Sequence, residues 1–191
     1  MSFISYLKDG ISLGSIYAII ALGYTMVYGI AKMLNFAHGD VIMVGAYIIL
    51  TCITRGGMSP VLAVAISVVV CTVLGVVIEK VAYSPLRKAS SNLAVLITAI
   101  GVSYLLQNLA LYVTGGLAQQ YPSIPWITDT ITVLGASTKR VTVITPFLTI
   151  ILVVVLVTLI KYTKIGMAMR AASKDFETSQ LMGIKINSVI S

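Results

Sequence analysis

Long uncharged apolar runs alternate with short polar stretches along the chain. The clearest runs cover residues 10–31, 60–78, 93–113 and 141–160. A helix needs about 20 predominantly apolar residues to cross the roughly 30 Å hydrocarbon core of a bilayer. The pattern therefore predicts an all-α fold, a polytopic transmembrane helical bundle.

A further apolar segment, 36–54, departs from this pattern. Its uncharged part, Val41–Thr54, covers only about 21 Å as a helix. Either the helix extends back through Asn35, His38 and Asp40, or the segment is broken or re-entrant. Ionisable groups then lie at or inside the membrane edge, where they are costly and normally face protein or water. Counting this segment, we expect about five spanning segments.

Polar side chains in the second and fourth segments are the candidate pathway residues. His38 and Asp40, two residues apart, point away from each other on a continuous helix, which argues against a catalytic pair. Asn35 or Asp40 could cap the helix, and capping is the favoured role for Asp40. Ser103 and Gln107 share one helix face, where such groups pair with a neighbouring helix or, alternatively, line a polar passage. The full set is Asn35, His38, Asp40, Ser103, Gln107 and Asn108.

Small residues recur every four positions in two of the runs, a spacing that lets another helix approach closely. The two ridges are Gly10–Gly14–Ala18 and Ala63–Ser67–Cys71–Gly75. Both predict close helix packing.

Residues 115–140 predict an extracytoplasmic loop. Two β-like runs, Thr130–Leu134 and Arg140–Ile144, flank a turn at Gly135–Lys139, which predicts a hairpin. Trp126 in this loop is typical of an anchor at the membrane interface.

Composition agrees with a membrane protein. Hydrophobic residues make up 58% of the 191 residues and charged residues 10%, against about 25% charged in an average soluble domain. The net charge of +7 is better explained by topology signals than by nucleic-acid binding. Cys52 and Cys71 lie in apolar segments, as small buried residues rather than a disulfide or metal pair. No cleavable signal peptide is recognisable, so the first run is expected to be a retained helix.

The longest polar segment, 161–187, is strongly basic. Its five basic residues outnumber Asp175 and Glu177, which predicts a cytoplasmic loop. Ser173 or Asp175 can cap a helix of roughly two turns, with Asp175 and Glu177 in its first turn, and Gly183 can close it. A solvated loop touching anionic lipid is the alternative. With five crossings, nine basic residues share this side and four lie opposite, which places the N-terminus outside; a re-entrant second segment moves it inside.

Motifs of catalysis are missing from the sequence. It contains no G-x-x-x-x-G-K-[ST] loop for ATP, no H-E-x-x-H motif and no Cys/His cluster. The single histidine has no plausible nucleophile beside it. We expect no catalytic residue, metal or cofactor, which leaves transport or another role as a membrane subunit.

Several stretches resemble the permease subunits of branched-chain amino acid ABC importers, of the leucine/isoleucine/valine permease H type. The resemblance covers nearly the whole chain. Its carriers are GISLGSIYAIIALGYTMVYGI (Gly10–Ile30), MLNFAHGDVIMVGAY (Met33–Tyr47), IEKVAYSPLR (Ile78–Arg87), LITAIGVSYLLQN (Leu96–Asn108) and TKIGMAMRAASKDFETSQLMGIKINSVIS (Thr163–Ser191).

The resemblance implies a multi-pass permease in the plasma (inner) membrane of a prokaryote. Two such chains, homologous or identical, would work with two ATPase subunits and an extracytoplasmic substrate-binding protein that faces 115–140. A coupling helix within Arg170–Met182 would dock on the ATPase, and no nucleic acid is involved. Its candidate residues, with the closing glycine, are Arg170, Ala171, Ala172, Lys174, Asp175, Phe176, Glu177, Leu181, Met182 and Gly183.

Two departures from the family pattern stand out. The coupling stretch lacks the E-A-A start of other importer permeases, since Ser173 follows Ala171 and Ala172. Family members continue into a second membrane block beyond Ser191, so a partial permease is expected. A secondary carrier or channel that uses Asp40 and His38 for ion or proton coupling is the alternative, and an inert anchoring protein is a third.

Overall fold

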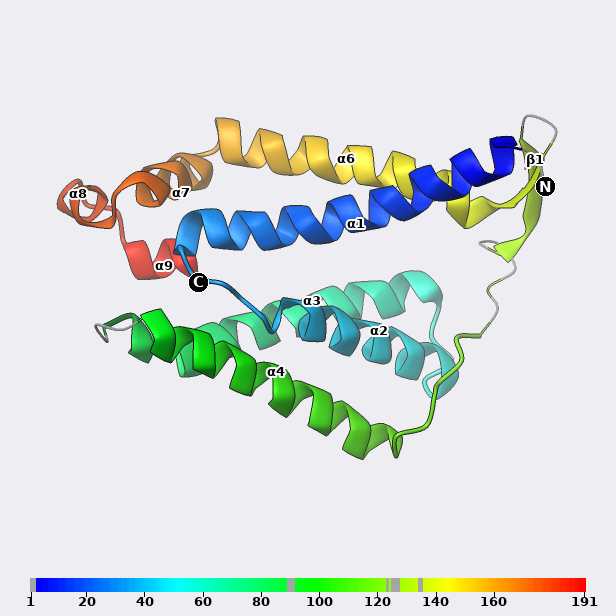
Figure 1. Cartoon of the computed structure of the whole chain (residues 1–191), viewed down its shortest axis with the longest axis horizontal. Helices are drawn as coiled ribbons and strands as arrows, with labels where there is room; N and C mark the ends of the chain where they lie inside the picture. The colour runs from blue at the N-terminus through cyan, green and yellow to red at the C-terminus, as the bar shows by residue number, and fades with distance from the viewer. Residues whose placement is uncertain (1–2, 89–91, 123, 125–127, 134–135) are drawn as a thin grey trace. The chain divides into compact units, whose positions relative to one another are not determined.

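The computed structural model describes residues 3–88, 92–122, 124, 128–133 and 136–191 (Figure 1). Its long helices are α1 (Phe3–Ala31), α2 (His38–Thr54), α3 (Pro60–Ile78), α4 (Asn92–Thr114) and α6 (Arg140–Tyr162), and the shorter ones are α7 (Lys164–Lys174), α8 (Phe176–Leu181) and α9 (Ile186–Ile190). A π-helical turn, η1 (Glu79–Tyr83), extends α3, and a 3-10 turn, η2 (Pro85–Lys88), follows.

Among these described residues, four helices are long and apolar enough to cross a membrane, and α2 is a shorter apolar helix. The predicted all-α polytopic membrane bundle is thereby confirmed. The helix α3 has the bounds of the predicted segment 60–78, whereas α1 begins at Phe3, well before residue 10.

The chain forms two compact units. The first contains residues 1–30 and 123–190, and the second contains residues 31–122 together with Ser191. Each unit is described on its own below.

In the second unit, α2 packs along α3 and also contacts α4. Gly45 lies at the centre of the α2–α3 contact. A Cβ atom there would lie 3.0 Å from Cys71 Sγ and 3.2 Å from Ser67 Oγ, and Ser67 Oγ donates to the Gly45 carbonyl at 3.0 Å. Ala63 is fully buried on the same ridge. The predicted packing role is confirmed for Ala63, Ser67 and Cys71, but not for Gly75, where a Cβ atom would meet nothing within 4 Å.

In the first unit, α1 and α6 are the spanning helices, and both expose most of their apolar side chains. No residue of α1 is buried, and a Cβ atom at Gly10 or Gly14 would meet nothing within 4 Å. Such surfaces suit lipid contact, since acyl chains are as apolar as leucine. The two glycines of the α1 ridge therefore make no close helix contact with the described residues.

The loop before α6 carries a two-stranded antiparallel hairpin, β1 (Thr130–Val133) and β2 (Ala136–Lys139), with Thr130 opposite Lys139. The predicted hairpin exists, but its second strand was placed wrongly. Arg140–Ile144 is the start of α6, and most of the predicted turn is strand β2. A short apolar β-branched run does not distinguish a strand from a membrane helix. Trp126, Leu134 and Gly135 lie outside the described residues.

Candidate functional site

Asp40 is a buried carboxylate held by another helix. It lies in the first turn of α2 and is 8% exposed. Ser103 Oγ of α4 donates to one carboxylate oxygen, and Gln107 Nε2 donates to the other at 3.0 Å. Gln107 Nε2 also donates to Ser103 Oγ at 3.1 Å. We call Asp40, Ser103 and Gln107 the carboxylate cluster. The predicted pairing of these α4 side chains with a neighbouring helix is confirmed.

The predicted capping role of Asp40 is wrong. The N-cap of α2 is Ala37, with no side-chain cap bond, while both Asp40 oxygens accept bonds from α4. Asn35 does not cap the helix with its side chain either, because its Oδ1 accepts from the Tyr83 hydroxyl at 2.9 Å.

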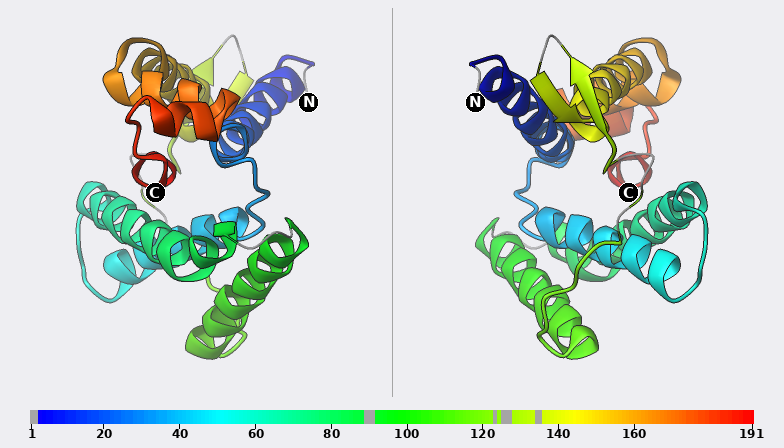
Figure 2. Two further views of the ribbon diagram at one scale, coloured as in Figure 1. Left: turned by 90° about the vertical axis from the view of Figure 1, so that its left-hand side faces the viewer. Right: turned by 90° about the vertical axis from the view of Figure 1, so that its right-hand side faces the viewer.

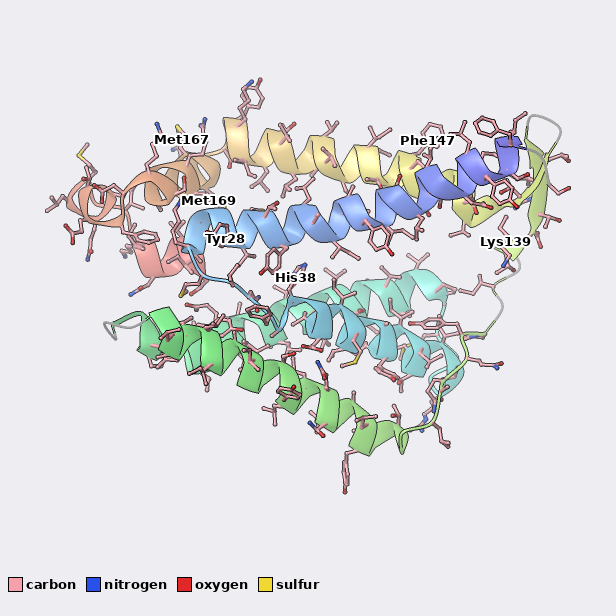
Figure 3. The ribbon with its side chains drawn as sticks, in the orientation of Figure 1. Tyr28, His38, Lys139, Phe147, Met167 and Met169 are labelled. Carbon is pink, nitrogen blue, oxygen red and sulfur yellow. The ribbon has the colours of Figure 1, made fainter. Side chains whose placement is uncertain are left out.

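The remaining polar candidates lie elsewhere in the second unit. Asn108 Nδ2 donates to the Tyr104 carbonyl of its own helix at 2.7 Å. His38 is the first residue of α2 (Figure 3), and its backbone N–H donates to the Asn35 carbonyl at 3.2 Å. The structure thus joins Asp40 with Ser103 and Gln107 but places Asn35 and Asn108 in separate interactions.

The carboxylate cluster lies halfway along α4. Ser103 is eleven residues from each end of Asn92–Thr114. The neighbouring residue Val41 lies opposite Cys71, whose Sγ approaches the Val41 carbonyl at 3.7 Å, and Cys71 is midway along the span Pro60–Tyr83. The start of α2 is therefore at mid-depth of two membrane-length helices. The helix extends back through His38 and Asp40, as one alternative for the second segment had it, but it does not include Asn35.

The non-helical residues 32–37 precede this helix start. Irregular backbone at membrane depth is tolerated only where it is buried in protein or lines a water-filled cavity. The Asn35–Tyr83 hydrogen bond provides one such protein contact. The segment is one reason to regard this region as a candidate pathway.

Outside the membrane-spanning helices, Tyr121 ties the loop after α4 to α2. Its hydroxyl donates to the Ala46 carbonyl, and burial raises the pKa of the phenol above its ordinary value of 10.0. Sequence reasoning missed this contact, because nothing around Tyr121 marks its partner.

A second candidate site is the corner between α6 and α7, which we call the elbow. Thr163 Oγ1 donates to the Leu159 carbonyl and accepts from the Gly166 amide at 3.0 Å. A Cβ atom at Gly166 would lie 2.2 Å from the Ile160 carbonyl oxygen, so only glycine fits here. Arg170 Nη2 donates to the Lys161 carbonyl at 3.2 Å, which satisfies a C-terminal carbonyl of α6. These bonds join the two helices firmly.

The helix α7 was not predicted. Its signal is present in the sequence, since Ile165, Ala168, Met169 and Ala172 recur at the helical spacing i, i+3, i+4 and i+7. Ala172 is buried and Ile165 exposed. The candidate residues Arg170, Ala171, Ala172 and Lys174 belong to its last turns.

The helix α8 is short and capped at both ends, as expected for a helix near 175–183. Asp175 is its N-cap residue and accepts bonds from the Glu177 and Thr178 amides and the Thr178 hydroxyl. At the other end Gly183 has φ +85, and the Gly183 and Ile184 amides donate to carbonyls of the last turn, a Schellman motif. The predicted cap at Asp175 and closure at Gly183 are confirmed.

The Thr178 hydroxyl, with the Thr178 and Glu177 amides, holds the pKa of Asp175 below its ordinary value of 3.8. The carboxylate is thereby kept charged at the helix N-terminus, where negative charge is favourable.

The stretch Arg170–Met182 is two helices, not one. Asp175 has extended backbone and separates α7 from α8. Phe176 and Glu177 begin α8, Leu181 ends it, and Met182 is the C-cap residue. In Figure 2 the two helices α7 and α8 are the separate orange and orange-red segments. Ser173, the alternative cap, instead lies in α7 and donates to the Arg170 carbonyl.

Leu181 and Met182 expose large apolar side chains outside the spanning helices. Leu181 is 88% exposed and Met182 79%. An adjacent exposed apolar pair on a capped helix suits insertion into an apolar groove of a partner.

Comparison with known proteins finds a single kind of protein, branched-chain amino acid transport permeases. Residues 6–191 match the family described as the branched-chain amino acid transport system permease component. The chain is 37% identical to the high-affinity branched-chain amino acid transport system permease protein LivH of Salmonella typhimurium and 38% identical to BraD, described in the same words, of Pseudomonas aeruginosa. Each match covers 98% of this chain and 64% of the relative.

A more distant relative is the probable branched-chain amino acid transport permease protein LivH of Methanocaldococcus jannaschii, 27% identical over 94% of this chain and 58% of that protein. No solved structure matches the chain. The chain thus spans about two thirds of the length of its curated relatives, with almost all of it aligned. It belongs to the family of branched-chain amino acid transport system permease components.

Proposed function

We propose that this chain is the membrane-spanning permease component of an ATP-binding-cassette importer for branched-chain or related amino acids. Family membership supports the transport role. The observation that carries the coupling role is the exposed Leu181–Met182 pair at the end of the capped helix α8. The membrane would be the plasma (inner) membrane of a prokaryote, with the basic segment 161–187 cytoplasmic.

The chain itself performs no chemistry in this proposal. Separate ATPase subunits hydrolyse ATP, a second permease chain completes the pathway, and an extracytoplasmic binding protein delivers the amino acid to 115–140. The Tyr121–Ala46 hydrogen bond would connect that loop to α2. Docking of the binding protein on the loop would then affect the helix that carries Asp40 of the carboxylate cluster.

Coupling would run from α8 through α7 to α6. An ATPase bound to α8 would move α7 as well. At the elbow, Gly166 lies against Ile160 and Arg170 donates to a carbonyl at the end of α6, so a movement of α7 would also move α6. ATP binding and hydrolysis act on the permease only through different contacts with two arrangements of its helices.

The carboxylate cluster and residues 32–37 would lie along the translocation pathway. One observation also favours a second candidate function, an ion- or proton-coupled carrier: Asp40 is a buried carboxylate at mid-depth. Uptake into vesicles driven by an ion gradient without ATP would support the carrier and contradict the ATP-driven importer.

The coupling role is tested by Leu181→Asp. A charge in an apolar contact should abolish co-purification with the cognate ATPase subunit, while membrane insertion is unchanged. The matched control is Leu117→Asp, at another exposed apolar residue, 71% exposed in the loop after α4. Normal ATPase binding by Leu181→Asp, or equal loss in both variants, would show that α8 is not the docking helix.

A further inference from the structure

A groove lies between the end of α1, the end of α6 and α7. Its apolar walls come from Leu22, Met26 and Ile30 of α1, Ile160 of α6 and Met169 of α7. Figure 3 shows Met169 on α7 next to the C-terminal end of α1. The groove has a volume of about 280 Å³ and is open on one side. All of its residues belong to the first unit.

One side chain gives the groove its polar character. Arg170 lines it together with the hydroxyl-bearing residues Thr25 and Ser173. Both hydroxyls donate to carbonyls of their own helices, Thr25 to Leu22 and Ser173 to Arg170. A guanidinium carries five N–H donors, and the bond to Lys161 uses one group, Nη2. Arg170 is therefore the lining residue that can bind an anionic group of a ligand.

Two further basic residues are next to lining residues in the sequence. Lys161 follows the lining residue Ile160, and Lys174 follows Ser173. Asp175, the next acidic residue, directs its carboxylate to the N-terminus of α8. An arginine in this setting binds phosphate in a planar, bidentate manner.

We propose that this groove binds an anionic phospholipid, with an acyl chain against α1 and the headgroup phosphate on Arg170. Within a bilayer, an apolar wall alone selects no occupant, because lipid tails are equally apolar. Charge decides the occupant, and basic pockets between membrane helices on the cytoplasmic side bind anionic headgroups. The proposal is independent of the ATPase contact, since no residue that lines the groove belongs to α8.

Gly29 provides a way to fill the groove. It lies among the lining residues, and a Cβ atom there would meet nothing within 4 Å. Gly29→Phe should therefore project into the groove without backbone strain. Gly14→Phe is the matched control, because Gly14 is on the same helix with equally open surroundings but does not line the groove.

The experiment is native mass spectrometry of the full chain in detergent, with phosphatidylglycerol or phosphatidylcholine added. The wild type and Gly14→Phe should retain more phosphatidylglycerol than phosphatidylcholine, and Gly29→Phe should lose this excess. Arg170→Gln, which removes the charge but keeps a long polar side chain with N–H donors, should lower phosphatidylglycerol retention about five-fold, the effect of about 1 kcal/mol per basic residue.

Three outcomes would overturn the proposal. One is equal retention of the two lipids by the wild type, and another is full retention by both Gly29→Phe and Arg170→Gln. The third is a change in oligomeric state caused by Gly29→Phe with lipid retention intact, which would make the groove a contact between copies of the chain. Circular dichroism checks that each variant is folded.

Discussion

Two ridges of small residues share one spacing, but among the described residues only the ridge on α3 closes tightly on another helix. Ala63, Ser67 and Cys71 on α3 close on Gly45 of α2, whereas Gly10 and Gly14 on α1 meet nothing. The difference lies in the partner. The helix α2 offers a glycine at the contact, and Ser67 donates to the carbonyl of that glycine from the other helix. Spacing therefore indicates that a helix can be approached closely, and polar complementarity decides which helix approaches.

The same contrast holds for hydrogen bonds between spanning helices. In the second unit, Asp40 accepts two bonds from α4. In the first unit, Thr149 Oγ1 lies 3.5 Å from the Ser15 carbonyl, while its shorter bond, 2.8 Å, goes to Thr145 of its own helix. The α2–α3–α4 group is held by its neighbours, and the first unit depends more on local bonds.

The largest effect should come from filling the α2–α3 contact. Gly45→Leu forces side-chain atoms into Ser67 and Cys71, and overpacking of this kind costs about 1–3 kcal/mol. Gly14→Leu on the open ridge should stay within about 0.5 kcal/mol of the wild type. Unfolding in mixed micelles with increasing dodecyl sulfate, followed by circular dichroism, measures both. An equal loss of stability in Gly45→Leu and Gly14→Leu would show that the two ridges do not differ in packing.

A smaller effect is expected at the carboxylate cluster. Asp40→Ala leaves Ser103 and Gln107 without their acceptor, at a cost of about 1–2 kcal/mol in the free energy of unfolding. Asp40→Asn, which retains an acceptor oxygen, should cost less. Thr149→Val removes the bond to Thr145 within its own helix and, between helices, only the 3.5 Å contact to Ser15, so it should cost less than Asp40→Ala. The same micelle titration compares the three variants; a larger loss for Thr149→Val would contradict the contrast between the units.

The spanning helices could be predicted from the sequence because each uncharged run is long enough to cross the bilayer core as a helix. The caps of α8 were equally predictable, since Asp175 and Gly183 act on backbone groups a few residues away. What local pattern could not give was Asp40's partner, because Ser103 is 63 residues further along the chain. Local rules assigned Asp40 to the nearest unsatisfied amides, and the tertiary contact overrode them.

Two other predictions failed for a different reason: Arg140–Ile144 was predicted as a strand, and the helix Lys164–Lys174 was not predicted. Arg140–Ile144 contains β-branched residues that suit a strand, yet the apolar run behind them extends the helix α6 back to Arg140. In α7, three basic residues obscured a helical pattern of apolar positions. In both places the local composition was ambiguous, and the continuation of the neighbouring helix or its packing at the elbow determined the structure.

The smallest effect is a pH response confined to α8, which lies outside the spanning helices. Asp175 has a lowered pKa in the folded state, so its contribution to α8 is fully present above its ordinary value of 3.8 and is lost as pH falls through the lower folded value. Amide hydrogen exchange at Glu177 and Thr178 should therefore lose protection in strong acid while α3 remains protected. Asp175→Asn keeps an N-cap acceptor that does not titrate, so its α8 should respond to acid far less. An equal acid response in wild type and Asp175→Asn would mean that the cap does not control α8, and that this helix, like α2, depends on neighbours rather than on its own terminal bonds.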